Sequence, residues 1–287
     1  MKCNAFFLLA AALMLIGCGH NPASPAEETT PTTLSEVYDK QDGPSMPDWI
    51  AATLGVIEHE RWLRGDSLRL SRDYYVRLLL QQEALHCFNS KGNHISLTGS
   101  PSQLLNLFTA HGALSYDGYH GRHGRINYNV LARKVEQIVL TSASEEEVCR
   151  RTEQLIDHEI DYLPNFVFLY GAEYTPMEFG HSILLDGDYT TLTPDDNTPT
   201  DTLLSLTRKA IAAGHHVVWQ GKDGSKNWLG ITKNGRNPLV TAEIVGVDSL
   251  TGDFLTKNTT RKKAHISVRD FRKKTLSITL LSELSGE

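Results

Sequence analysis

Several absences narrow what this 287-residue sequence can do. It carries 28 Lys and Arg against 34 Asp and Glu, a formal net charge of -6, so it has no basic excess that would favour nucleic acid as a partner. The histidine-containing stretches at 119–123 and 157–159 lack zinc-site spacing with a third ligand, so we expect neither a metal nor another cofactor. No internal repeat is visible. The 40% hydrophobic content suits one or two globular domains with a full core.

The N-terminus has the pattern of a secretion signal. Lys2 precedes an apolar run over 5–16, which is too short to cross a membrane. The run ends in Leu-Ile-Gly-Cys at Cys18, which looks like a bacterial lipobox and implies cleavage before that cysteine and a lipid on its sulfur. We therefore predict a signal peptide over 1–17 and a bacterial envelope lipoprotein held to a membrane, the outer membrane favoured, through Cys18. The alternative is an ordinary signal peptide with an incidental cysteine.

Residues 18–45 are expected to form a disordered tether between the lipid and the folded part. Five of the eleven prolines lie between 19 and 47, with Thr, Ser and Glu among them, and such a segment cannot bury enough apolar surface to fold. Beyond the tether only Cys87 and Cys149 remain. A disulfide between them is possible in an oxidising envelope, and the sequence leaves it open.

The first half of the folded part has helical patterns. Apolar residues at 49, 50, 54, 56 and 57 predict a buried helix, and Asp48, directly behind Pro47, is a candidate for its N-cap. Ser71 and Ser100 are candidate caps of two later helices. The further helical patterns lie at 70–83, 100–112, 128–140 and 144–160.

From residue 165 onward the sequence pattern changes to short runs rich in β-branched residues, bounded by Gly, Asn and Asp. These runs predict strands of an antiparallel sheet or barrel, and a helix is expected near 202–213. The expected strands lie at 166–170, 216–219, 242–248, 265–268 and 275–280. We therefore predict an α+β fold with a helical subdomain over 46–164, a β-rich subdomain over 165–287 and a cleft between them. The basic run 257–263 is interpreted as a solvated strand edge or turn.

Several ordered motifs resemble papain-like cysteine peptidases, most closely the aminopeptidase C and bleomycin hydrolase branch. The stretch 41–60, with Trp49 after the nucleophile position, resembles the Gln-Gly-x-x-x-x-Cys-Trp helix of that branch. The stretches 173–179 and 186–193 resemble its Tyr-Thr-Pro-x-x-Phe and Asp-Asp-Tyr-Val-x-Leu-Thr segments, and 217–221 its Val-Ala-Trp-x-Gly strand. The resemblance covers roughly the whole chain after the tether and implies a papain-like fold.

The same resemblance assigns the chemical positions, and two of them are changed. A papain-like peptidase needs a thiolate at a helix N-terminus, a histidine to carry the proton and an Asn or Asp to orient that histidine. Asp48 stands in the nucleophile's place and Val240 in the histidine's place. Asn258 matches the orienting Asn, and Gln41 is a loose counterpart of the oxyanion-hole glutamine. Peptide hydrolysis through Asp48 is implausible, because its attack would have to expel an amine and leave a reactive anhydride.

The interpretation is an inactive papain-fold lipoprotein whose old cleft, with Asp48, Trp49 and Asn258, binds a peptide or protein partner. A simple N-cap role for Asp48 is the alternative at that position. One rival is a true enzyme, either with catalytic residues displaced to Cys87 and the pair 215–216 or as another hydrolase that uses Asp48. Against it, Cys87 has the pattern of a packed cysteine and the two histidines that of polar strand-edge residues. Another rival is a structural subunit of an outer-membrane assembly.

Overall fold

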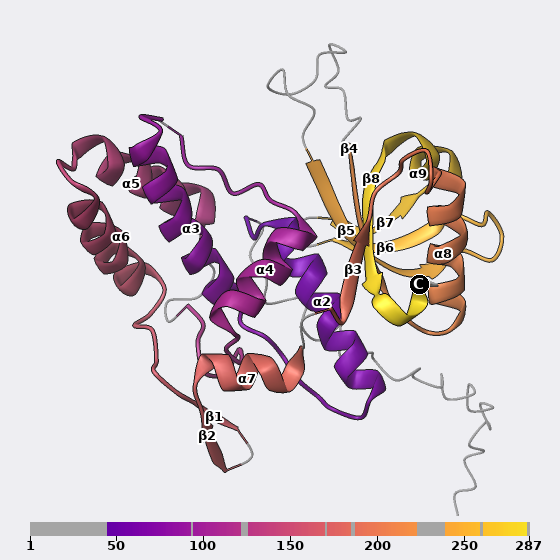
Figure 1. The fold of residues 1–287 in the computed structure, drawn as a ribbon, viewed down its shortest axis with the longest axis horizontal. Helices are drawn as coiled ribbons and strands as arrows, with labels where there is room; N and C mark the ends of the chain where they lie inside the picture. Colours follow the sequence, from indigo (N-terminus) through magenta and orange to yellow (C-terminus); the bar gives the residue numbers. More distant parts are fainter. Residues whose placement is uncertain are drawn as a thin grey trace, which may run out of the picture.

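The computed structural model confirms the α+β class: helices fill the first half of the folded chain and an antiparallel sheet dominates the second (Figure 1). Gln41, Cys18 and the rest of the expected signal peptide and tether lie outside the described residues. None of the helices in the described part is long and apolar enough to cross a membrane. The described residues are 45–92, 94–121, 126–169, 171–184, 187–222, 239–258 and 261–285.

The helices of the first half follow the predicted patterns closely. Ser71 accepts a hydrogen bond from the Tyr74 amide and Ser100 from the Gln103 amide, so both predicted N-caps are confirmed. Gly112 ends its helix at a φ of 73°, a conformation that glycine adopts without strain. The helices are α2 (Asp48–Leu63), α3 (Arg72–Asn89), α4 (Pro101–His111), α5 (Tyr128–Thr141) and α6 (Glu145–Glu159).

The N-cap predicted at Asp48 is wrong by one residue. The helix α2 begins at Asp48 itself, and Pro47 occupies the capping position without a side-chain hydrogen bond. Pro47 has φ -60° and ψ 120°, the non-helical backbone that a capping residue adopts, so the first helical turn starts directly after it. Asp48 therefore sits within the first turn, where a carboxylate is favoured by the helix dipole.

The large sheet has the strand order β3-β8-β4-β5-β6-β7, and every neighbouring pair is antiparallel. The described parts of the basic run, 257–258 at the end of β6 and 261–263 at the start of β7, lie at the β6–β7 edge of this sheet, in agreement with the interpretation as a strand edge or turn. The strands are β3 (Tyr189–Leu192), β4 (Val217–Lys222), β5 (Leu239–Val247), β6 (Phe254–Asn258), β7 (Arg261–Ile266) and β8 (Thr275–Leu281).

The strand predicted over 265–268 ends early. Ile266 closes β7, and Ser267 caps the helix α9 (Val268–Lys274) by accepting a hydrogen bond from the Asp270 amide. The capping serine therefore turns Val268 from a strand residue into the first residue of a helix. The helix expected near 202–213 is α8 (Thr200–Ala212), and a short 3-10 turn, η2 (Ser282–Leu284), follows β8.

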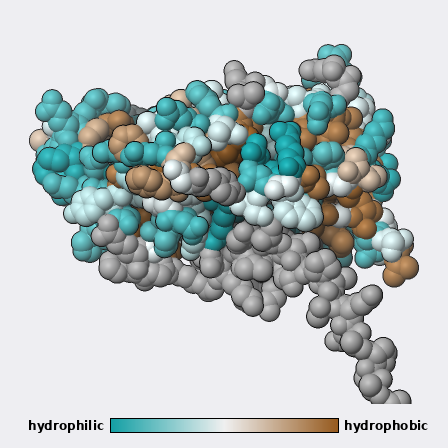
Figure 2. All heavy atoms as spheres, turned by 90° about the horizontal axis from the view of Figure 1, so that it is seen from below, coloured by the Kyte–Doolittle hydropathy of each residue, from teal (hydrophilic) through white to brown (hydrophobic). Residues whose placement is uncertain are grey.

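A small two-stranded sheet, β1 (Val167–Leu169) and β2 (Ala172–Tyr174), stands apart from the large one (Figure 1). Together with α7 (Pro176–Ile183) it packs on the helical half, because Val167, Phe179 and Ile183 belong to the helical core. Phe168 of β1 is 76% exposed. Figure 2 views the molecule from the hairpin's side and shows hydrophobic side chains exposed among hydrophilic ones.

Helix α2 lies between the two halves of the molecule. One of its faces, including Ile50 and Leu54, belongs to the helical core, while Ala52 and Val56 pack against Val218 of β4. The opposite face of the sheet is covered by α8 and α9, as Figure 1 shows. A second core lies between that face and those helices. The buried central helix therefore brings its own N-terminus to the junction where the site was predicted.

Candidate functional site

The start of α2 is held by the loop that precedes α4. Trp49 is buried, and its Nε1 donates a hydrogen bond to the Leu97 carbonyl at 2.9 Å. Gly99 lies so close to the indole ring that a β-carbon there would be 2.5 Å from Trp49 Cε2. Only a glycine fits this approach, so the loop fixes the helix residue that follows Asp48.

A buried glutamine ties the same loop to the large sheet. Gln220 of β4 donates from Nε2 to the Gly99 carbonyl at 2.9 Å and to Thr241 Oγ1 of β5 at 3.1 Å. Because Gly99 also packs on Trp49, these contacts place Gln220 and Thr241 at the level of the α2 N-terminus. Gln220 is the fourth residue of the Val-Val-Trp-Gln-Gly stretch, and no local pattern distinguished it as a site residue.

The strand register brings the other predicted positions to this end of the sheet. Val240 lies one residue before Thr241, near the start of β5, and pairs with Gly221 of β4. Lys257 pairs with Glu243, so the backbone of the next residue, Asn258, lies at the level of Ala242, two residues from Val240. The structure thus gathers the backbone positions of Asp48, Val240 and Asn258 near one end of α2.

The chemistry available at this end differs from that of a cysteine peptidase. Asp48 supplies a carboxylate in the first helical turn, where the helix dipole favours negative charge. Val240, half-buried and packed on the second core, can neither accept nor deliver a proton. Without a histidine at position 240, these two positions lack the proton carrier that acyl transfer needs.

The histidines of the chain that meet α2 lie elsewhere, toward its C-terminal end. His215 Nδ1 is 2.9 Å from Glu60 Oε2, and His216 Nδ1 is 2.7 Å from Glu243 Oε1. His59 stacks on His216 with ring centroids 3.4 Å apart and planes 4° from parallel. We call these five residues the His–Glu cluster.

The surroundings of the His–Glu cluster shift two of its pKa values downward. Burial lowers the pKa of His59, and the neighbouring His216 lowers it further, while the hydrogen bond from His59 Nε2 to the Gly214 carbonyl opposes the shift. Burial alone would raise the pKa of Glu243, which is 2% exposed. The hydrogen bond from His216, with the charges of His216 and Lys257, outweighs burial and holds the pKa of Glu243 below its ordinary value.

The His–Glu cluster is too far from Asp48 to serve it. An α-helix rises about 1.5 Å per residue, so His59 lies about 16 Å from Asp48 along α2. The structure therefore does not bring His215 and His216 to the predicted site, because their partners are the carboxylates of Glu60 and Glu243. Glu243 itself was missed. The sequence feature that could have identified Glu243 is a single carboxylate inside an otherwise apolar strand.

The cysteines of the folded part are not joined. Cys87, in α3, is 3% exposed and belongs to the helical core, and Cys149, on α6, is exposed. Both thiols are free. The position of Cys87 agrees with a packed cysteine. Within the described ranges, no three His, Cys, Asp or Glu side chains are grouped as metal ligands.

Comparison with known proteins gives structural but not sequence likeness. No protein-family model and no curated protein matches the sequence. PepW from Lactobacillus rhamnosis HN001 matches the structure with a TM-score of 0.54 and 14% identity, over 85% of this chain and 79% of PepW. Xylellain, a cysteine protease from Xylella fastidiosa, matches with a TM-score of 0.45 and 12% identity, over 83% of this chain and 82% of its own. The likeness to PepW concerns the fold alone, and with it the predicted papain-like α+β architecture is confirmed.

Proposed function

We propose that this chain, which has a papain-like α+β fold, is a catalytically inactive peptidase homologue of the aminopeptidase C type that binds a peptide or protein partner at the N-terminus of α2. The observation that carries the proposal is Asp48 as the first residue of that helix, with Val240 at the nearby end of β5. A peptidase of this type would need a thiolate and a histidine at these two positions.

The ligand class follows from the charge at this end of the helix. Asp48 stands in the first turn of α2, where the helix dipole favours a negative charge, and its side chain is only partly buried. An ionised, partly exposed carboxylate can pair with the ammonium group at the N-terminus of a peptide. We therefore propose that a free peptide N-terminus is recognised by Asp48, next to Trp49 and near the backbone position of Asn258.

The cell envelope is the proposed location. The Leu-Ile-Gly-Cys stretch ending at Cys18 supports a lipid anchor, and residues 18–45 are long enough to hold the folded part well away from the membrane surface. A partner would then be an envelope peptide or protein rather than a nucleic acid.

The test is turnover of a panel of fluorogenic aminopeptide and dipeptide substrates by the full chain. The wild type is compared with Asp48→Cys, Val240→His and the double variant. We expect a silent wild type. The side chain of Val240 packs on the second core, across the sheet from α2, so Val240→His tests whether an imidazole on that residue can turn to the helix N-terminus, and hydrolysis by the double variant alone would show that it does.

Two outcomes would contradict the proposal. Hydrolysis by the wild type that survives Asp48→Ala would place the chemistry elsewhere and favour the rival enzyme, with Cys87 the first residue to label with a thiol-directed inactivator. A calorimetric titration of the wild type with short free peptides that shows no saturable binding would remove the peptide-binding part. The deep burial of Cys87 counts against the rival.

A further inference from the structure

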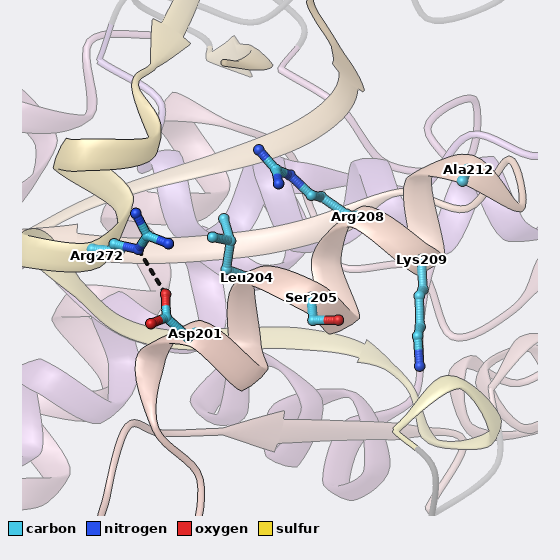
Figure 3. A pocket seen from close by; sticks show the side chains of 7 residues that line it. All are labelled: Asp201, Leu204, Ser205, Arg208, Lys209, Ala212 and Arg272. Atoms are coloured by element: carbon cyan, nitrogen blue, oxygen red, sulfur yellow. Dashed lines mark hydrogen bonds and ion pairs between the residues drawn. The ribbon is translucent and has the colours of Figure 1, made fainter. Parts of the chain in front are cut away.

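A hollow on α8 lies outside the site at α2. It opens on the outer side of α8, where α9 lies beside it (Figure 3). The other side of α8 buries Leu203, Thr207 and Ala210 toward the sheet. The hollow therefore lies across the sheet from α2 (Figure 1). Its lining side chains are Asp201, Leu204, Ser205, Arg208, Lys209, Ala212 and Arg272.

The lining of the hollow has an excess of positive charge. Its cations are Arg208, Lys209 and Arg272, and its single carboxylate is Asp201. Arg272 Nε donates to Asp201 Oδ1 at 2.6 Å, which neutralises one of the cations. Arg208 Nη2 donates only a long bond, 3.4 Å, to the Gly252 carbonyl. About two positive charges thus remain without a carboxylate in the lining.

The two arginines face the same hollow from different helices. Figure 3 shows Leu204 between Arg208, from α8, and Arg272, from α9, while Lys209 extends another way. The bond to Asp201 uses only Nε of Arg272, so the terminal amino groups of that guanidinium keep their donors for a ligand. Leu204 gives the hollow an apolar floor, and Ser205 adds an exposed hydroxyl.

We propose that this hollow binds a phosphate group, either as free phosphate or as the headgroup phosphate of an anionic lipid. Guanidinium groups suit phosphate because their planar set of N–H donors can meet two oxygens at once and because they are weakly hydrated. Because Lys209 extends another way and Arg272 is paired with Asp201, the net charge that faces the hollow is about one, that of Arg208, which suits a singly charged phosphate group. The apolar floor accommodates the carbon chain of a lipid but is not needed by the free ion.

Calorimetric titration of the full chain tests the proposal with two probes. One probe is inorganic phosphate, and the other is dihexanoyl phosphatidylglycerol below its micelle concentration, so that an anchor in the chain cannot partition into a bilayer. We expect saturable binding that weakens about tenfold or more in Arg208→Gln and in Arg272→Gln, since each variant removes charged hydrogen bonds. The affinity should also fall as NaCl is raised.

Arg150→Gln provides the matched control. Arg150 is an exposed arginine on α6, in the helical half, and its loss changes the net charge equally. Binding of both probes, or of one alone, supports the proposal and identifies the source of the phosphate. No saturable binding of either probe would overturn it, as would an equal loss in Arg150→Gln. Thermal melting of each variant verifies that these exposed substitutions leave the fold intact.

Discussion

The two ends of α2 differ in their surroundings. The helix begins with Asp48, near the backbone of Val240 in β5. About 16 Å further along the helix, His59 and Glu60 contact the histidines 215 and 216. The first end has a carboxylate and no proton carrier on the neighbouring strand. The second has three imidazoles and two buried carboxylates, joined by hydrogen bonds and ring stacking. Both ends belong to the same buried helix, so the difference between them comes from the side chains that surround each end.

The His–Glu cluster consists of groups that stabilise the junction between α2 and the sheet. In the His–Glu cluster each carboxylate already has a histidine partner, and Glu243 also packs against Gly55 so closely that a β-carbon there would lie 2.5 Å from its Oε2. Perturbed pKa values often mark functional sites, but buried structural pairs perturb them as well. The geometry assigns the His–Glu cluster to the second class: it joins α2 to the start of β4.

The largest expected effect is loss of stability when the His–Glu cluster is broken. Glu243→Ala removes the acceptor of the buried His216 hydrogen bond and leaves a void, and we expect the free energy of unfolding to fall by about 3 kcal/mol. Urea denaturation measures the change. Glu243→Gln keeps the shape and an amide oxygen that can accept the same hydrogen bond, so it should cost less. No loss in either variant would show that the cluster does not hold the junction together, whereas equal losses would show that the charge of Glu243, rather than its shape, does so.

Acidification should lower the stability of the protein through the His–Glu cluster. The pKa of His59 lies below its ordinary 6.5, so the unfolded chain takes up a proton first and the free energy of unfolding falls as the pH drops below about 6.5. The pKa of Glu243 is also depressed, and its contribution is present above 4.5 and is lost as the pH falls through the folded-state value. Both groups therefore make the protein less stable in acid.

Unfolding free energies measured in urea at a series of pH values between 7 and 4 test this prediction. The matched variant is His59→Gln, whose amide can still donate to the Gly214 carbonyl but does not titrate. It should flatten the decline that starts near pH 6.5 and leave the later decline in place. A wild type equally stable across that range would contradict the assignment.

The sequence predicted local structure better than it predicted this contrast. The helices were found because caps such as Ser71 and Ser100 act on amides three residues away. The His–Glu cluster was not found, because His216 and Glu243 are 27 positions apart and meet only through the pairing of β4 with β5. The hydrogen bond from Gln220 to Gly99 spans 121 positions and was missed for the same reason.

The short strands show the same limit. The motif 186–193 was noted, but nothing local indicated that Tyr189–Leu192 forms an edge strand, since its partner β8 lies near the end of the chain. For the candidate site, the resemblance to papain-like peptidases pointed to Asp48 and Val240, and their roles stay predictions. It could not indicate that His215 and His216 pair with Glu60 and Glu243, because that depends on the packing of α2 against the sheet.

The smallest expected change in stability is at the first end. Asp48→Asn removes a charge that favours the helix dipole, which should lower the free energy of unfolding by only about 0.3–1 kcal/mol. Under the proposed function the same variant should bind peptides with a free N-terminus more weakly and leave N-acetylated peptides unaffected, because only the former carry an ammonium group. Glu146→Gln, in the first turn of α6, is the matched control: a similar small stability change with unaltered peptide binding. If Asp48→Asn binds free peptides with unchanged affinity, Asp48 only starts the helix and does not bind the peptide. The two ends of α2 would then differ in their contribution to stability alone.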